Sequence, residues 1–486
     1  MSKKRRNLWL LIALTVVMGG ALWLLLRGGG EEGHTHAHDV SDSDESGRQS
    51  GILVNEAQED LQGLVFRNEN AEYTAYLNET SGQVAFRELE GYPVNENFME
   101  YVWFSVPQML YQDIITRTDD EGYSAKTYGL DKPALTVKAT FATGKTYEFY
   151  AGSNVPGYDE DVYYVRLKGD KNIYACTLDT PLFMGNSYYL SDDIFYEYDK
   201  DIDEKKQITI GKITLSGDNF DGSFVMQPSD ITNLSDPFYG YEYLVTSPVY
   251  WPVKKSSASM LVYDLTYLMA DDVAALNPTQ KQLRSYGLRS PALTVSFVRN
   301  GRKCVLYGSK PEKGVMYVMV KGQSIVYRLD TESLSLLHNL SPQTLYSVSA
   351  LSVSLEAISG IQVKSADVSA KVSVTRSKNE NAITENDLIY TYTAKANGKE
   401  IGYSLYTNFV KQMNDSVILQ WNVSRPKGKA TVTLTIQYFD NYQRKSDTIL
   451  FYRVSDREYA VVWGDQPVNT VTATWLNRLL ENAKKL

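Results

Sequence analysis

The side chains that most often carry out catalysis are scarce in this sequence. Four histidines occur, and three of them, His34, His36 and His38, alternate within one short polar segment. Alternating imidazoles can bind a transition metal loosely, but a stable site needs surrounding groups that orient the ligands. A solvated tail is therefore the better interpretation. The fourth histidine, His338, stands alone in the rest of the chain and is expected to be structural or exposed.

Three segments resemble ligand-binding loops, but each lacks a feature that its chemistry requires. The G-x-G-x-x-G spacing at 28–33 follows an apolar segment and opens no strand–helix unit, so it predicts no dinucleotide site. The segment 42–53 begins like a calcium loop but has Leu53 where a bidentate glutamate is needed. The Gly-Lys-Thr at 144–146 has Ala139 in place of the glycine that starts a phosphate loop.

Possible nucleophiles and carboxylate pairs are equally incomplete. Ser424 begins an S-x-x-K pattern, but Pro426 disfavours the helical turn that such enzymes need. Acidic clusters at 159–161, 192–193 and 199–204 could form a carboxylate pair or a calcium site, although solvated loops explain them better. The sequence therefore predicts no catalytic residue, no cofactor and no metal site. A non-enzymatic protein is expected, with a cryptic carboxylate hydrolase as the least favoured alternative.

Composition and charge restrict the number of domains and the classes of partner that the protein can have. The 486 residues suggest about three domains, and 43% apolar residues suffice for packed cores. The formal charge of −9 comes without a basic stripe, which argues against nucleic-acid binding. Two cysteines, Cys176 and Cys304, do not make a disulfide framework, and two buried thiols are favoured over a bridge.

Tyrosine is abundant, with 36 copies in the chain. Tyrosine suits half-buried strands and protein interfaces, so packing is its expected role. Tyrosines and acidic residues crowd together around 147–198, and aromatic rings beside carboxylates can stack on sugars. Binding of a cell-wall glycan is therefore kept as an alternative function.

The N-terminus has the pattern of a membrane anchor. Four basic residues at 3–6 precede the uncharged segment 7–26. Twenty helical residues span about 30 Å, the thickness of the hydrocarbon core. The charge asymmetry predicts a cytoplasmic N-terminus and an extracytoplasmic remainder. A cleaved signal peptide is the competing interpretation, because Gly19 and Ala21 provide small residues for a cut. We predict a cytoplasmic tip and anchor over 1–26 and a flexible tether over 27–55.

An internal repeat is the strongest signal in the chain. The segment 128–137 recurs as 286–295 with seven of ten positions identical, and 421–426 is a fainter third copy. The third copy replaces the motif's glycine by asparagine, which is the usual non-glycine residue at positive φ. The residues that define this structural motif are Tyr128, Gly129, Leu130 and Pro133; Tyr286, Gly287, Leu288 and Pro291; and Trp421, Asn422 and Pro426.

The same elements are predicted around each motif copy. A helical candidate precedes each one, over 96–115, 256–276 and 400–419, and Pro107 is expected to kink the first. The glycine or asparagine then suits a turn that leaves the helical region, and the proline starts an extended strand.

Strand patterns follow each copy of the motif. Apolar and polar residues alternate over 135–141, 293–297 and 432–438, which is typical of half-buried antiparallel strands. Turn dipeptides follow these strands, and Asn-Gly is the clearest hairpin signal among them. The turns are at 143–144, 300–301 and 440–441, and further strand-like segments are at 162–167, 172–177, 315–320 and 324–329.

These patterns predict an α+β fold with three diverged repeats, each a helix plus a mainly antiparallel β-hairpin sheet. We place the repeat modules at 56–205, 206–345 and 346–486. The period is too long for a thin-repeat solenoid, so each module is expected to be a domain with its own core.

The Tyr-Gly-Leu-x-x-Pro element, the hairpin that follows it and the basic N-terminal anchor resemble the bacterial family known as domain of unknown function 4340. Members of that family are associated with ABC-type transporter genes. The resemblance implies an extracytoplasmic accessory or scaffold protein at the cell membrane, with an ABC-type permease or another envelope protein as partner. It supplies no catalytic residue.

Overall fold

The structure of the protein, a computed structural model, describes residues 49–200, 207–378 and 390–486. By their contacts these residues form two compact units. Among the described residues, the first unit comprises 49–69 and Val102–Phe183, and the second comprises Asn70–Tyr101 and the described residues from Met184 to Leu486. Within both units the strand pairs are antiparallel, and short helices accompany the sheets, so the fold is α+β.

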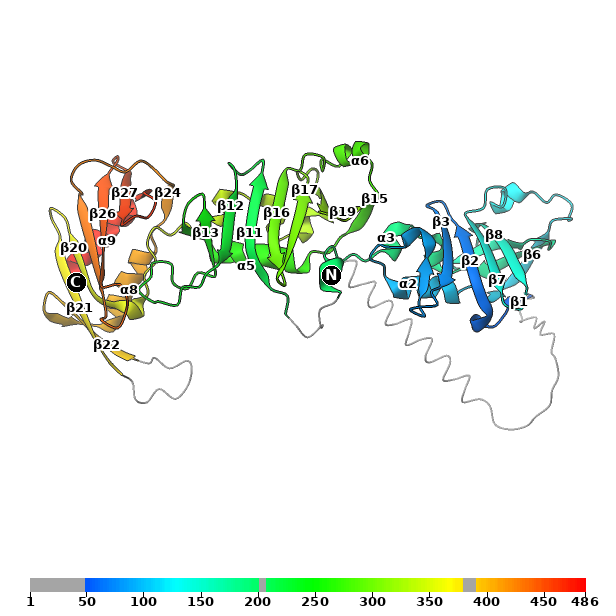
Figure 1. The fold of residues 1–486 in the computed structure, drawn as a ribbon, viewed down its shortest axis with the longest axis horizontal. Helices are drawn as coiled ribbons and strands as arrows, with labels where there is room; N and C mark the ends of the chain where they lie inside the picture. Colours follow the sequence, from blue (N-terminus) through cyan, green and yellow to red (C-terminus); the bar gives the residue numbers. More distant parts are fainter. Residues whose placement is uncertain (1–48, 201–206, 379–389) are drawn as a thin grey trace. The chain divides into compact units, whose positions relative to one another are not determined.

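The first unit contains six adjacent strands of one sheet and a separate strand pair. The pair joins β1 (Gly51–Asn55) to β5 (Gln108–Tyr111). A short 3-10 helix, η3 (Ala125–Tyr128), precedes the central strands. The six strands lie in the order β2 (Leu61–Arg67), β7 (Leu135–Phe141), β8 (Thr146–Asn154), β9 (Val162–Leu167), β10 (Asn172–Thr177) and β6 (Asp113–Arg117) (Figure 1).

The second unit contains two nine-stranded sheets, which we call the second and the third sheet. It also contains the hairpin of β3 (Glu72–Leu77) and β4 (Val84–Phe86) and the helices α3 (Asn186–Tyr189) and α4 (Tyr196–Asp199). The second sheet has the order β14 (Trp251–Pro252), β13 (Tyr243–Ser247), β12 (Phe224–Pro228), β11 (Ile210–Gly217), β16 (Leu293–Arg299), β17 (Arg302–Gly308), β18 (Val315–Val320), β19 (Ile325–Asp330) and β15 (Asp272–Leu276).

Helices of the second sheet connect its strands and close its end. The longest is α5 (Lys255–Tyr267), and α6 (Gln280–Ser285) lies just before the repeated motif. After β19 come η5 (Thr331–Ser333), η6 (Leu337–Asn339) and α7 (Pro342–Leu345). Leu261 and Leu265 of α5 are fully buried and belong to the same hydrophobic cluster as the strands of this sheet.

The third sheet repeats this plan. It is preceded by η7 (Leu355–Ala357) and carries α8 (Tyr403–Asn414) and α9 (Ala473–Lys485). Its strand order is β23 (Lys399–Ile401), β22 (Tyr390–Ala396), β21 (Ser369–Lys378), β20 (Ile358–Lys364), β25 (Val432–Tyr438), β26 (Ser446–Arg453), β27 (Glu458–Trp463), β28 (Asn469–Thr472) and β24 (Ile418–Gln420) (Figure 1).

The three sheets share one topology. When strands are numbered along the chain within each nine-stranded sheet, both sheets read 4-3-2-1-6-7-8-9-5. The six strands named in the first unit follow the same order as β11, β16, β17, β18, β19 and β15 of the second sheet. The sequence repeat therefore corresponds to a repeated strand order.

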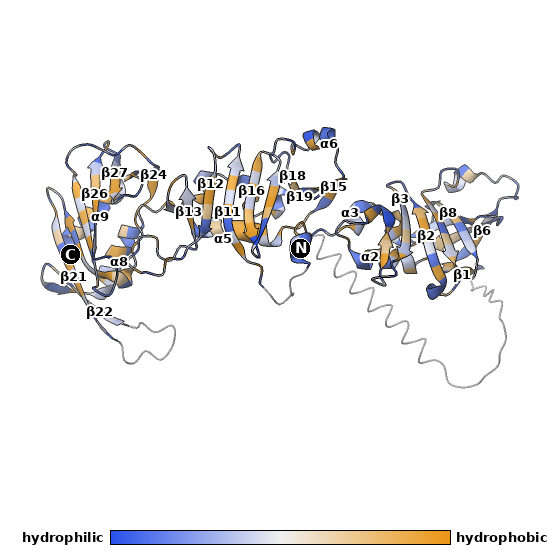
Figure 2. Cartoon of the chain, viewed as in Figure 1, coloured by the Kyte–Doolittle hydropathy of each residue, from blue (hydrophilic) through white to orange (hydrophobic). Residues whose placement is uncertain are grey.

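The predicted alternation is observed in the strands that follow each motif. In β16, Leu293, Val295 and Phe297 are buried while the residues between them are partly exposed. Figure 2 shows the resulting mixture of hydrophobic and hydrophilic residues along the strands. Both β9 and β10 have the predicted bounds, and the Asn300-Gly301 turn has φ of 50° and 78°, as a two-residue hairpin turn of mirror type requires.

The predicted long helices are wrong in their second halves. The helices α2 (Glu96–Phe104), α5 and α8 begin close to 96, 256 and 400, but they end well before 115, 276 and 419. The C-terminal part of each predicted helix instead includes all or part of a strand at the edge of its sheet, namely β6, β15 or β24. Pro107 therefore lies beyond the end of α2 and does not kink it.

The predicted anchor over 1–26 and most of the tether lie outside the described residues. Among the helices that are described, none is long and apolar enough to cross a membrane. The histidines at 34, 36 and 38 and the glycine-rich segment at 28–33 also lie outside the described part of the chain.

Candidate functional site: an aromatic pocket beside the third motif

The repeated motif contains one residue in the left-handed backbone conformation in each copy. The φ angles are 70° at Gly129, 71° at Gly287 and 50° at Asn422. Gly129 follows η3 and Gly287 follows the end of α6, so each glycine ends a short helix. Asn422 instead follows strand β24. The expected conformation is therefore present in all three copies. A short helix stands just before it in the first two copies, and strand β24 stands between α8 and Asn422 in the third.

The other motif residues serve packing. Leu130 and Leu288 are buried at 6% and 4% exposure. Pro133 and Pro291 stand two residues before β7 and β16, where an extended backbone suits a proline. Pro426 lies in a segment of the third copy without helix or strand, so Ser424 and Lys427 do not share a helical turn.

A glycine near the end of one strand packs against the first copy of the motif and was not predicted from the sequence. Gly152 lies two residues before the end of β8. A Cβ atom on Gly152 would overlap the carbonyl oxygen of Tyr128, so the strand can approach the motif only with glycine there.

The aromatic residue that begins each motif has different neighbours in the third copy. Tyr128 packs edge-on against Tyr164 at 4.9 Å between ring centroids, within the first unit. Tyr286 packs against Tyr317 of the second sheet at 4.7 Å, and its hydroxyl donates to the carbonyl of Ala274. Both tyrosines therefore pack beside their own sheet.

Trp421 instead contacts residues that belong to the second sheet and its closing helix. Its ring stacks on Tyr346 at 5.0 Å with 26° between the planes, and meets Trp251 edge-on at 5.5 Å. The third copy of the motif has thus become part of the junction between the second and third sheets.

A pocket of about 180 Å³ opens beside these rings, and we call it the junction pocket. Its walls come from turns and chain ends of both sheets and are almost entirely apolar. Asp221 and Pro248 are exposed at its edge, and the Ser247–Pro248 peptide bond is cis. The pocket is lined by Phe220, Asp221, Phe224, Pro248, Val249, Pro342, Tyr346, Trp421, Asn422 and Pro467.

Hydrogen bonds hold the walls in place. The indole N–H of Trp251 donates to the carbonyl of Ser347 at 2.9 Å, which fixes the chain just after Tyr346. The backbone N–H of Asn422 donates to the side-chain oxygen of Asn469 at 3.0 Å. Burial raises the pKa of Tyr346, so this ring of the wall is neutral at physiological pH.

The shape and lining of the junction pocket suit one apolar side chain. Pockets for drug-sized ligands usually measure roughly 300–1,000 Å³, and this one measures about 180 Å³. Its lining has no histidine, cysteine or serine, and Asp221 is its one carboxylate, whereas glycoside hydrolysis needs two. The pocket therefore offers binding surface and no evident catalytic group.

The structure places the acidic residues singled out in the sequence in different environments. Among the described residues, no group of three or more histidine, cysteine, aspartate or glutamate side chains could hold a metal ion. The expectation of a solvated loop is wrong for Asp199, whose side chain is 17% exposed and pairs with Arg299, itself 2% exposed. Asp193 accepts the N–H of Phe195 at 2.9 Å, and burial raises its pKa.

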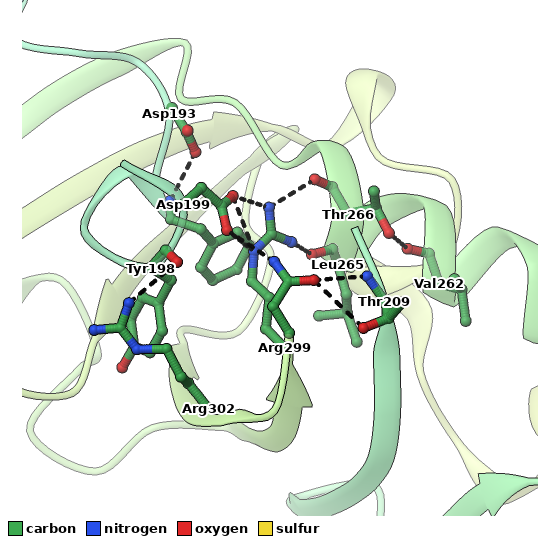
Figure 3. A network of polar contacts seen from close by, with 11 residues as sticks. Asp193, Tyr198, Asp199, Thr209, Val262, Leu265, Thr266, Arg299 and Arg302 are labelled. Carbon is green, nitrogen blue, oxygen red and sulfur yellow. Dashed lines mark hydrogen bonds and ion pairs between the residues drawn. The ribbon is translucent and has the colours of Figure 1, made fainter. Parts of the chain in front are cut away.

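The Arg299 network is structural (Figure 3). The guanidinium of Arg299 donates to Asp199, to the carbonyl of Leu265 at 2.6 Å and to that of Thr266 at 3.1 Å. Its carbon lies 4.7 Å from the ring centre of Phe195. Because helix-end carbonyls lack partners within the helix, Arg299 both ends α5 and fastens the segment around α4.

The remaining predicted residues are buried or structural. Cys176 and Cys304 are buried and free, as the sequence favoured. His338 lies in η6 and is partly buried.

Comparison with known proteins finds a family model that matches part of the chain. Residues 244–431 match the model of a family described as Domain of unknown function (DUF4340). The match begins in β13 and ends before β25, so it includes α5, α8 and both Tyr346 and Trp421. No curated protein and no solved structure matches the chain.

Proposed function

We propose that this chain is a non-enzymatic binding protein of the bacterial cell envelope, in which the junction pocket docks one apolar side chain of a partner protein. The observation that carries the proposal is the junction pocket itself. It measures about 180 Å³ and is walled by aromatic rings and prolines on two sheets.

A protein partner suits this pocket better than a metabolite does. Binding hot spots in protein interfaces are pockets that bury one aromatic or apolar anchor side chain. Proline-rich segments likewise dock in grooves lined by aromatic rings. The walls are held by hydrogen bonds from Trp251 and Asn422, so binding a partner costs little conformational entropy in the pocket.

The identity of the partner rests on the N-terminal sequence and on the family resemblance. The basic residues 3–6 and the uncharged segment 7–26 support an anchor in the cell membrane, with the folded part outside the cytoplasm. The resemblance to transporter-associated proteins then favours the extracytoplasmic part of an ABC-type permease as partner. An apolar side chain on that permease is the expected occupant.

Filling the pocket tests the proposal. Val249 is partly buried in the pocket wall, and Val249→Trp should occupy the space that the partner needs. The matched control is Val454→Trp, because Val454 is 57% exposed and is not among the residues that line the pocket. The full-length variants are purified from membranes in mild detergent, and co-purifying permease is quantified by mass spectrometry.

We expect loss of permease from Val249→Trp alone, with unchanged thermal melting of both variants. Equal recovery of permease with both variants would reject the pocket as the docking site. The glycan alternative predicts a different result: wall fragments would co-sediment with the wild-type protein and with Val454→Trp, but not with Val249→Trp, and no permease would be recovered.

A further inference from the structure

A second cavity lies entirely within the second sheet and its closing segment. It measures about 300 Å³, which is at the lower end of the range of small-molecule sites. We call it the His338 cavity. It is lined by Asp218, Asn219, Phe220, Ala292, Leu293, Ser309, Lys310, Pro311, Met316, Leu337, His338 and Leu340.

The wall that carries His338 is rigidly held. The carboxylate of Asp264, on the buried face of α5 and 3% exposed, accepts the backbone N–H groups of Ser335, Leu336 and Leu337 at 2.8, 2.7 and 2.7 Å. In the sequence, Asp264 stands among the apolar residues of the buried helix face, and this position could have indicated the contact. These bonds fix the start of η6 and therefore the position of His338.

The opposite walls are fixed in the same way. The side-chain amide of Asn219 donates to the carbonyl of Leu340 at 3.0 Å and joins the β11–β12 turn to η6. The hydroxyl of Ser309 accepts the backbone N–H of Tyr317 at 2.9 Å. The cavity is therefore preformed, with polar side chains from three separate chain segments.

One buried nitrogen and two exposed charged side chains of the lining residues have no polar partner among the described residues. The Nδ1 atom of His338 is buried and has no hydrogen-bond partner in the described part of the chain. Buried polar atoms without partners are rare in folded proteins, because their desolvation is not repaid. Lys310 and Asp218 line the same cavity, and neither forms an ion pair with another described residue.

We propose that the His338 cavity binds a small zwitterion with an apolar side chain, of the class of the apolar α-amino acids. The ligand carboxylate would face Lys310 and its ammonium would face Asp218. Met316 and Leu337 provide the surface for the apolar side chain.

The proposal is independent of the junction pocket and follows from the two unlike charges. Asp218 in the lining disfavours a simple anion, and Lys310 disfavours a simple cation. A ligand that carries both charges together with an apolar group suits the charged and the apolar residues of the lining.

Titration calorimetry of the full-length protein in detergent tests the proposal, with L-leucine, L-methionine and L-phenylalanine as probes. We expect saturable binding of at least one of them. N-acetylation or amidation of that amino acid removes one charge and should weaken binding at least about tenfold. Absence of binding by all three, or equal binding of a blocked form, would overturn the zwitterion assignment.

Variants locate the site. Lys310→Met and Asp218→Asn should each weaken binding at least about tenfold. Lys303→Met is the control, because Lys303 is exposed on β17 and does not line the cavity. Lys310 and Asp218 are both exposed, so their variants should melt like the wild type. Unchanged affinity in the Lys310 and Asp218 variants would show that the amino acid binds elsewhere.

Discussion

The conformation of single residues explains the spacing of the repeated motif. Gly129, Gly287 and Asn422 all adopt positive φ, which costs most residues energy because Cβ meets the following carbonyl. The identical spacing in the sequence was enough to predict this conformation. It was not enough to predict the neighbours, because the contact of Gly152 with Tyr128 joins segments that only the sheet brings together.

Alanine at Gly129 should destabilise the first unit more than alanine at Gly144. Both glycines have positive φ, 70° and 82°, so both variants carry backbone strain of about 1–2 kcal/mol. A Cβ atom on Gly129 would also lie 2.7 Å from the backbone nitrogen of Ser153, whereas Gly144 has open space around it. Urea unfolding should therefore show a larger loss of unfolding free energy for Gly129→Ala. Equal losses would refute the packing argument.

The two cysteines should be unreactive in the folded protein. Burial raises the pKa of Cys304 to about 11 and raises the pKa of Cys176 as well. The thiolate is the reactive form, so neither residue presents it near neutral pH. A thiol reagent should count close to zero groups in the native protein at pH 7.5 and two in denaturant. Rapid native reaction of either cysteine would contradict its burial.

At the scale of elements, strands were predicted well and helix ends were not. The strand-like character of 162–167 and 172–177 is a local pattern, and β9 and β10 have those bounds. The carbonyls of Leu265 and Thr266 at the end of α5 are bonded by Arg299, which is distant in sequence. The residues of the helix itself therefore give no local indication of where it ends. The short edge strand β15 then begins within the predicted helix, where local periodicity did not separate the two structures.

Removal of the Arg299 guanidinium should be costly. In Arg299→Met, the carboxylate of Asp199 and two carbonyls at the end of α5 lose their buried donor. Loss of one partner from a buried ion pair typically costs 3–5 kcal/mol, so we expect a loss of about 3 kcal/mol in unfolding free energy. Thermal and denaturant unfolding followed by tryptophan fluorescence measure it.

Arg302→Met is the matched control for this prediction. Arg302 is exposed and donates to the carbonyl of Tyr198 at 3.4 Å, with its guanidinium 5.8 Å from the Tyr198 ring centre. An exposed contact of this kind is worth less than about 1 kcal/mol. Similar losses for the two variants would show that the buried network does not fasten α4 to the second sheet.

At the scale of the whole molecule, one topology carries different surfaces. The second and third sheets have the same strand order, yet the motif aromatic contacts its own sheet in one and the neighbouring sheet in the other. The sequence showed that Trp421 replaces a tyrosine. It did not show the junction pocket, because Phe220, Tyr346 and Trp421 come from distant segments that meet only in the folded chain.

Release of the folded part from the membrane should abolish partner association under the proposed function. A tether restricts a binding domain to the membrane surface and so raises its effective concentration for a membrane partner. Residues 27–55 have the composition of such a tether, and segment 7–26 has that of an anchor. We therefore expect a form cut at about residue 50 to lose the permease, and the same form on an unrelated membrane helix to recover it. Co-purification from detergent-treated membranes measures both. Full association of the released form would show that the anchor is dispensable, and failure of the re-anchored form would show that segment 7–26 itself contacts the partner.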